Sequence, residues 1–201
     1  MSFPNPAFRR GWLLRIAVAG CALGGCYHGT AHSVTPSDLE TTPGWQIVDG
    51  MRMVHQESER DCGAAALSMM LERWGTAAPT RADVLRDAPA DAEKGMAAGA
   101  LRDVARQRGL AAFLIHGQLD DLVREVSAQR PVLVGLIQRY GQKAYAHYEV
   151  VVGVNPRQQR LLLFDPGRGA REDGFEGFAA EWKGSAQLAL VVTGKTAGGP
   201  P

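Results

Sequence analysis

The sequence predicts an α+β domain, in which helices come first and an antiparallel sheet follows. Between 61 and 128 apolar residues recur mainly at helical spacing, whereas strand-like runs separated by turn residues dominate from 131 to 193. The chain has 201 residues, of which 45% are hydrophobic and 21% are charged. These values suit one compact domain with a buried core.

Helices are expected to dominate the first part of this domain. The first should begin at Asp61, a good N-cap, and end at Gly75, because apolar residues recur at i, i+3, i+4 and i+7 from Leu67. Thr80 is the expected N-cap of the second. The helices after the first are expected at 80–87, 97–108 and 119–128, and the strands at 45–54 and 110–115.

The later part reads mainly as strands. A strand is expected at 132–138, followed by a hairpin in which 145–154 and 160–164 pair across the turn at 155–159. The turn residues at 166–169 end the returning strand. A short amphipathic helix at 175–182 and a last strand at 186–193 complete the expected fold.

The first 25 residues have the features of a secretory signal rather than of the fold. Three arginines precede a short apolar run, which ends in small residues followed directly by cysteine, as in the lipobox of bacterial lipoproteins. Cys21 and Cys26 both fit, but Cys26 leaves ten residues after Arg15, within the usual ~7–15-residue apolar core. We therefore expect lipidation of Cys26. A non-cleaved anchor is the alternative, although the run is short for a membrane span.

A lipidated N-terminus divides the chain into four parts. Residues 1–25 are the expected lipoprotein signal peptide, 26–44 a flexible tether, 45–193 the folded domain and 194–201 a disordered tail. The expected location is the bacterial cell envelope, on the periplasmic face of the outer membrane. The residue after the lipidated cysteine is Tyr27, whereas an aspartate at that position is associated with retention in the inner membrane. The membrane is then a partner through the lipid, whereas a net charge of +1 without a basic block gives no support for nucleic-acid binding.

Cleavage before Cys26 leaves Cys62 as the only free thiol. Cysteines in an oxidising compartment usually form pairs, so a lone one is a candidate reactive thiol, with an inert buried cysteine as the alternative. Cys62 follows the expected N-cap, where unpaired N–H groups and the helix dipole favour a thiolate. No metal or cofactor is implied, because one free cysteine and scattered histidines offer no ligand spacing.

A base for this thiol is expected among five histidines: His28, His32, His55, His116 and His147. The first four lie in the tether or in isolated positions, whereas His147 opens a strand and the returning strand ends at Asp165. If the turn centres on Arg157, the numbers of facing residues sum to 314 and Asp165 falls on the face of His147. A turn half a residue later would put Asp165 on the opposite face.

A glutamine, Gln56, lies six residues before Cys62. Acyl transfer through a thiol builds negative charge on the substrate carbonyl oxygen, and a side-chain amide with a backbone N–H can hold that charge. By itself a glutamine carries little information, since most are surface residues.

Together these residues resemble the peptidase C39 family of papain-like cysteine peptidases, best known for processing bacteriocins after a double-glycine leader. The motifs that carry the resemblance are Gln56, the runs 61–71 and 74–75, the strand 147–152 and the turn 165–167, and the resemblance covers about 45–192. It implies a papain-like fold, with N-terminal helices packed on a C-terminal antiparallel sheet. It also implies a role for each residue: Cys62 as nucleophile, His147 as base, Asp165 as orienting residue and Gln56 as oxyanion-hole donor.

The implied activity is that of a cysteine peptidase that cleaves an exported peptide or protein through a thioester acyl-enzyme, with an export system as a further partner. The best-known members are fused to an exporter and face the cytoplasm, whereas the signal here implies an exported domain, which argues against double-glycine leaders as substrates. Two alternatives remain open. An acyl transferase or amidase would resolve the same acyl-enzyme with another acceptor, and a catalytically silent module would only bind peptide.

Overall fold

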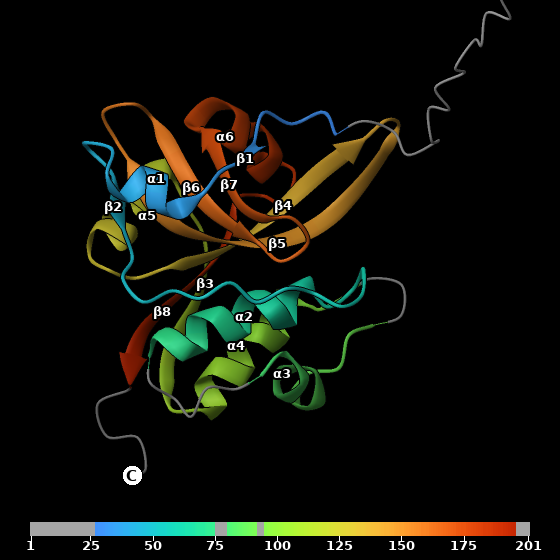
Figure 1. Cartoon of the computed structure of the whole chain (residues 1–201). Helices are drawn as coiled ribbons and strands as arrows, with labels where there is room; N and C mark the ends of the chain where they lie inside the picture. The colour runs from blue at the N-terminus through green and yellow to red at the C-terminus, as the bar shows by residue number, and fades with distance from the viewer. Residues whose placement is uncertain (1–26, 75–79, 92–94, 196–201) are drawn as a thin grey trace, which may run out of the picture.

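A computed structural model describes residues 27–74, 80–91 and 95–195 of the chain (Figure 1). The helices within these residues are α1 (Pro36–Glu40), α2 (Cys62–Arg73), α3 (Arg81–Asp87), α4 (Ala98–Gln107), α5 (Leu119–Ser127) and α6 (Phe175–Lys183). The strands are β1 (His32–Ser33), β2 (Gln46–Ile47), β3 (Leu110–His116), β4 (Val132–Tyr140), β5 (Lys143–Asn155), β6 (Arg160–Asp165), β7 (Gly169–Gly174) and β8 (Leu188–Lys195).

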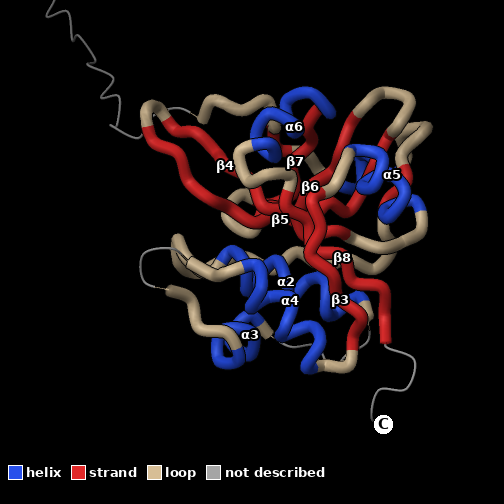
Figure 2. Tube along the Cα trace, turned by 180° about the vertical axis from the view of Figure 1, so that it is seen from behind, coloured by secondary structure: helices blue, strands red, loops and turns tan. Residues whose placement is uncertain are grey.

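The strands form one antiparallel sheet of order β1-β7-β6-β5-β4-β8-β3, with β2 paired to the far end of β5. Helices α2, α3 and α4 lie together on one side of it, and α5 and α6 lie on the other (Figures 1 and 2). Adjacent residues of β5 point to opposite faces of the sheet, since Val150 belongs to the same core cluster as Leu67 of α2, and Val151 to the same cluster as Trp182 of α6. The predicted α+β fold, with N-terminal helices on an antiparallel sheet, is confirmed.

The helices expected at 80–87, 97–108, 119–128 and 175–182 all form, with their ends shifted by at most one residue. Their buried residues are the apolar ones spaced for a single face, such as Leu101 and Val104 in α4 and Leu122 and Val126 in α5. In the parts of the chain that the structure describes, no helix is long and apolar enough to cross a membrane.

Helix α2 begins where the sequence predicts, but Asp61 does not cap it with its side chain. The Asp61 carboxylate instead accepts hydrogen bonds from the backbone N–H groups of Glu57 (3.2 Å) and Ser58 (3.0 Å), and it pairs with Arg81 of α3. This arrangement ties the loop 57–60 to the first turn of the helix. The predicted end at Gly75 lies outside the described residues, after the C-cap at Trp74.

The β5–β6 hairpin changes register along its length. Beside the turn, Asn155 pairs with Arg160, so the numbers of facing residues sum to 315. If this register continued, Asp165 at the end of β6 would lie on the face opposite to His147. A β-bulge at Val152 follows, and beyond it the sum is 314, as Val150 pairs with Phe164. The register expected at the end of β6 is therefore present, but only because an extra residue in β5 restores it.

The described part of the expected tether, 27–44, lies against the fold instead of extending from it. Strand β1 pairs with the outer edge of β7, α1 forms at Pro36–Glu40, and Leu39 packs against the core. The expectation of a flexible tether is therefore wrong for these residues, because β7 offers unpaired backbone groups that 32–33 can satisfy. Residues 1–26, with Cys21 and Cys26, lie outside the described residues.

Strand β7 was not expected, because 166–169 indicate a break and only Ala170 of the strand is apolar. Strand β8 begins two residues later than expected. Ala186 and Gln187 have φ values of 57° and 59°, which lie in the left-handed region and not in the β region that a strand requires. Strand β8 also runs to Lys195, so the first two residues of the expected disordered tail belong to the sheet. The rest of that tail, 196–201, lies outside the described residues.

Helix α3 provides a test of local stability near the site, because it carries Arg81. Thr80 and Asp83 form a reciprocal capping box: the Thr80 hydroxyl accepts from the Asp83 N–H (3.2 Å), and the Asp83 carboxylate accepts from the Thr80 N–H (2.9 Å). Thr80→Ala should lower the free energy of unfolding by about 1 kcal/mol, measured by urea denaturation. Thr80→Ser keeps the hydroxyl and should remain within a few tenths of a kcal/mol of the parent; equal losses in both variants would contradict a capping role.

Candidate active site

Cys62 lies in the first turn of α2, where the helix packs closely on the sheet. Its side chain is 7% exposed, and it is a free cysteine within the described residues. The next residue, Gly63, leaves no space for a side chain, since a Cβ there would lie 3.1 Å from Tyr148 of β5 and 3.2 Å from Leu101 of α4. The glycine thus lets the helix bring the thiol close to β5.

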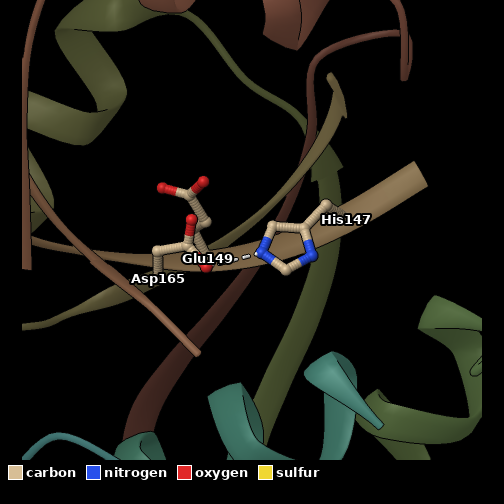
Figure 3. A group of neighbouring side chains, drawn as sticks. All are labelled: His147, Glu149 and Asp165. Carbon is tan, nitrogen blue, oxygen red and sulfur yellow. Dashed lines mark hydrogen bonds and ion pairs between the residues drawn. The ribbon is translucent and has the colours of Figure 1, made fainter. Parts of the chain in front are cut away.

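His147 and Asp165 are joined by a hydrogen bond between β5 and the end of β6 (Figure 3). Nε2 of His147 lies 2.8 Å from Oδ1 of Asp165, which also accepts the backbone N–H of Gly167 (2.7 Å). Burial opposes the charge on His147, but the hydrogen bond with Asp165, interaction with Cys62 and nearby carboxylates raise its pKa from 6.5 to about 10. Burial would raise the pKa of Asp165, yet its contacts with His147 lower it. The pair is therefore an imidazolium and a carboxylate near neutral pH.

The same imidazole also reaches the thiol. Interaction with the neighbouring Cys62 is one of the effects that raise the pKa of His147. Because Nε2 faces Asp165, Nδ1 is the ring nitrogen left for the sulfur. The structure thus brings together three of the four predicted site residues in one chain of contacts.

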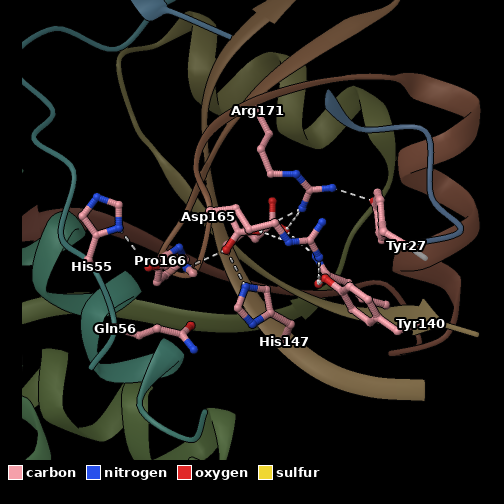
Figure 4. Close-up of polar contacts among 12 residues, drawn as sticks. Tyr27, His55, Gln56, Tyr140, His147, Asp165, Pro166 and Arg171 are labelled. Atoms are coloured by element: carbon pink, nitrogen blue, oxygen red, sulfur yellow. Dashed lines mark hydrogen bonds and ion pairs between the residues drawn. The ribbon is translucent and has the colours of Figure 1, made fainter. Parts of the chain in front are cut away.

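Gln56 is anchored beside this group, on the loop that precedes α2 (Figure 4). Its backbone N–H donates to the carbonyl of Pro166 (3.0 Å), the residue after Asp165. Its side-chain Nε2 donates to the carbonyl of Ser58 (2.9 Å), while Oε1 is buried without a hydrogen-bond partner among the described residues. One N–H of the amide is thus used inside the loop, and the second remains for a ligand; the oxyanion role of Gln56 stays a prediction.

The fold and these contacts can be compared with known proteins. The sequence model of the peptidase C39 family matches residues 51–195, which hold all four predicted site residues. The chain belongs to the peptidase C39 family. Among curated C39 relatives, it is 25% identical over 133 residues to the lactococcin-G-processing and transport ATP-binding protein LagD of Lactococcus lactis subsp. lactis. That match covers 66% of this chain but 18% of the relative, so the chain spans a small part of that protein.

Solved C39 structures share the fold. The peptidase domain of Streptococcus ComA, a bifunctional ABC transporter, superposes with a TM-score of 0.60 at 24% identity, covering 72% of this chain and 99% of that one. A C39-like peptidase from Bacillus anthracis gives 0.61 at 15% identity, covering 76% and 99%. A double-glycine-motif protease of an AMS/PCAT transporter, solved with a leader peptide, gives 0.58 at 21% identity, covering 75% and 94%. The papain-like cysteine peptidase fold predicted for this chain is therefore confirmed.

A buried polar network behind Asp165 was missed by the sequence analysis of this C39 domain. Arg171 of β7 donates through Nη1 to Oδ2 of Asp165 (3.0 Å) and to Oε1 of Glu149 (2.6 Å), and Gln138 of β4 also donates to Glu149 (2.6 Å). Burial raises the pKa of Glu149 to about 8, although Arg171 acts against this shift. Glu149 could have been found, since it lies two residues from His147 and shares its face; Arg171 could not, because β7 was not predicted.

Three of the other four histidines have partners elsewhere. His32 lies 3.6 Å from Glu172, His55 Nδ1 lies 3.2 Å from the Pro166 carbonyl, and His116 Nδ1 lies 2.7 Å from the Ala186 carbonyl. None of these contacts involves Cys62. They agree with the choice of His147 as the histidine next to the thiol.

His147, Glu149 and Asp165 place ligand atoms within 4.8 Å of one another, a spacing that also suits a metal ion (Figure 3). The charges around them do not fit one. Arg171 already donates to both carboxylates, and Gln138 donates to the same oxygen of Glu149. A cation would meet the guanidinium charge and displace these hydrogen bonds, so the group is better described as an internal ion-pair network.

The raised pKa of His147 makes stability depend on pH. Because the folded-state pKa of about 10 exceeds the ordinary 6.5, protonated His147 stabilises the fold fully below about pH 6.5, and this contribution disappears as the pH rises through 10. The loss of unfolding free energy in His147→Gln should therefore shrink steadily from pH 6.5 to 10 in urea titrations. His116→Gln is the matched control and should show no such trend. A loss that is constant with pH would refute the charged state of His147.

Proposed function

We propose that this C39 domain is a lipid-anchored cysteine peptidase that cleaves exported peptides or proteins. One observation carries the proposal: the His147 imidazole is hydrogen-bonded to Asp165 through Nε2 (2.8 Å), and Cys62 at the start of α2 is a neighbour that raises its pKa. A thiol, an imidazole and a carboxylate in this order are the parts that nucleophilic acyl transfer requires. Family membership supports the same activity.

The reaction follows from the charge states. An imidazolium at His147 stabilises a thiolate at Cys62, which attacks the substrate carbonyl carbon. The tetrahedral intermediate collapses as His147 gives its proton to the leaving amine, the C–N bond breaks and a thioester forms. His147 then takes a proton from water, the hydroxyl attacks the thioester, and the C–S bond breaks to return the thiolate.

Two donors would hold the oxyanion of this intermediate. The free N–H of the Gln56 amide is one, and a backbone N–H at the start of α2 is the other, since the first turn of the helix has no side-chain cap. Asp165 keeps Nε2 of His147 protonated and fixes the ring plane, so that Nδ1 handles the proton in both half-reactions.

Peptide substrates are supported by the relatives, whose names describe lactococcin G processing, quorum sensing and leader-peptide binding. The N-terminal lipobox supports an attachment through Cys26 in the bacterial envelope, on the periplasmic face of the outer membrane. There the partner would be an export system that delivers its cargo to the enzyme.

Alkylation of the thiol tests the enzyme directly. Iodoacetamide should modify Cys62 faster than free cysteine at pH 6–7, and His147→Ala should remove this advantage, because the imidazolium no longer stabilises the thiolate. Cleavage of a reporter peptide should fall ~10²–10⁴-fold in His147→Ala and ~10²–10³-fold in Gln56→Ala. His116→Ala is the matched control. Labelling of Cys62 no faster than that of free cysteine would refute the peptidase; products joined to an added amine would instead indicate transfer.

Lipidation can be tested in cells that express the whole chain. Metabolic labelling with an alkyne fatty acid should label the protein, and Cys26→Ser should abolish the signal while Cys21→Ser retains it. Both substitutions are isosteric, so each controls for the other. Loss of label in Cys21→Ser alone would move the anchor to Cys21, and loss in neither would exclude lipidation at these sites.

A further inference from the structure

The network behind Asp165 ends at the N-terminal segment of the described chain. Oδ1 of Asp165 contacts His147 and Gly167. The rotation of the carboxylate group therefore also depends on the partner of its second oxygen, Oδ2. That oxygen accepts from Nη1 of Arg171 at 3.0 Å. The orientation of the imidazole therefore depends on where the Arg171 guanidinium lies.

Arg171 is itself held on two sides. Its Nη1 also donates to Glu149 (2.6 Å), while its Nη2 donates to the phenol oxygen of Tyr27 (2.6 Å), and the guanidinium lies 4.9 Å from the Tyr27 ring (Figure 4). The residue is 1% exposed, so water cannot replace a lost partner easily. Glu149 fixes the guanidinium from the sheet, and Tyr27 fixes it from the N-terminal segment.

Tyr27 is locked in place by its surroundings. The Arg168 guanidinium lies 4.3 Å from its ring, and the Tyr140 ring lies 5.6 Å away at the tip of the β4–β5 hairpin. Burial and the nearby Glu181 carboxylate raise the pKa of Tyr27, so the phenol stays neutral. A neutral hydroxyl can accept the hydrogen bond that Arg171 donates.

The backbone that carries Tyr27 is fixed at both ends. The His28 N–H donates to the Arg139 carbonyl (3.0 Å) at the hairpin. Further along, Ser33 pairs with Arg171 in the β1–β7 ladder, and the Val34 N–H donates to the Ala170 carbonyl (3.1 Å). The segment 27–34 thus contacts Arg171 through both its backbone and its first side chain.

We propose that Tyr27 is a positioning residue for the peptidase reaction, which holds Arg171 against Asp165 and so aligns His147 with Cys62. This inference rests on the proposed function. It gives the residue that directly follows the proposed lipidation site a place in the active-site network. The N-terminal segment is then part of the catalytic domain, although it precedes the residues matched by the family model.

Tyr27→Phe in the whole chain tests the proposal, because it removes the hydroxyl and keeps the ring between Arg168 and Tyr140. We expect iodoacetamide labelling of Cys62 and kcat/KM for a reporter peptide to fall about tenfold, as is typical when a partner of an active-site side chain is lost. The loss should lie in kcat. The pH profile of Cys62 labelling should also shift, which a purely structural contact would not cause.

Tyr145→Phe is the matched control, since Tyr145 lies on the same hairpin, 5.9 Å from the Tyr140 ring, and is 47% exposed. It should retain the parent rate and pH profile. As a second readout, the ¹H NMR signal of the His147 Nε2 proton can be observed in the folded protein without substrate. This signal should move in Tyr27→Phe and stay unchanged in Tyr145→Phe.

The outcomes separate the two proposals. If His147→Ala slows labelling while Tyr27→Phe keeps the parent rate, pH profile and proton signal, the role of Tyr27 is refuted and the peptidase stands. If His147→Ala leaves labelling unchanged, the peptidase is refuted and the role of Tyr27 with it. Equal effects in Tyr27→Phe and Tyr145→Phe would also overturn the proposal, because they would not depend on the hydrogen bond to Arg171.

Discussion

The site depends on a group of buried ionisable side chains that are stable only together: His147, Glu149, Asp165 and Arg171. An isolated charge in this position would cost several kcal/mol, and pairing offsets the cost only when the geometry satisfies each partner. The four side chains come from β5, β6 and β7, so these strands must keep one register. The fold therefore cannot shift one strand without leaving a charge unpaired, and this constraint holds the imidazole in place beside the thiol.

The positions of His147 and Asp165 could be predicted because strand geometry is periodic. Alternate residues share a face, and a hairpin fixes which residues oppose each other. The bulge at Val152 could not be predicted in this way. Val151, Val152 and Val154 are all buried apolar residues, so the sequence offers no polar residue to mark where the extra one lies. The correct outcome at Asp165 thus came from two effects that cancel, a shifted turn and a bulge.

The missed elements share a different cause. Strand β7 contains Arg171 and Asp173, which normally indicate solvent, yet both are buried: Arg171 pairs with two buried carboxylates, and Asp173 accepts from the Thr30 hydroxyl. Such pairing is a tertiary property, and neither propensity nor alternation reveals it. The segment 27–34 is ordered for a similar reason, since its polar residues gain backbone partners on the edge of β7. Sequence alone therefore predicted that His147 and Asp165 lie together, and it missed the residues that hold this pair in place.

The ordered N-terminal segment also changes the meaning of a lipid anchor. A flexible chain of the length expected for 26–44 would let the domain move through roughly 25 Å from the membrane. With Tyr27 bound to Arg171, a lipid on Cys26 would instead fix the domain at the bilayer surface, beside the β4–β5 hairpin. The enzyme could then act only on substrates that come within reach of a fixed site. If the proposed function and anchor hold, the position of the domain at the membrane would itself help to select its substrates.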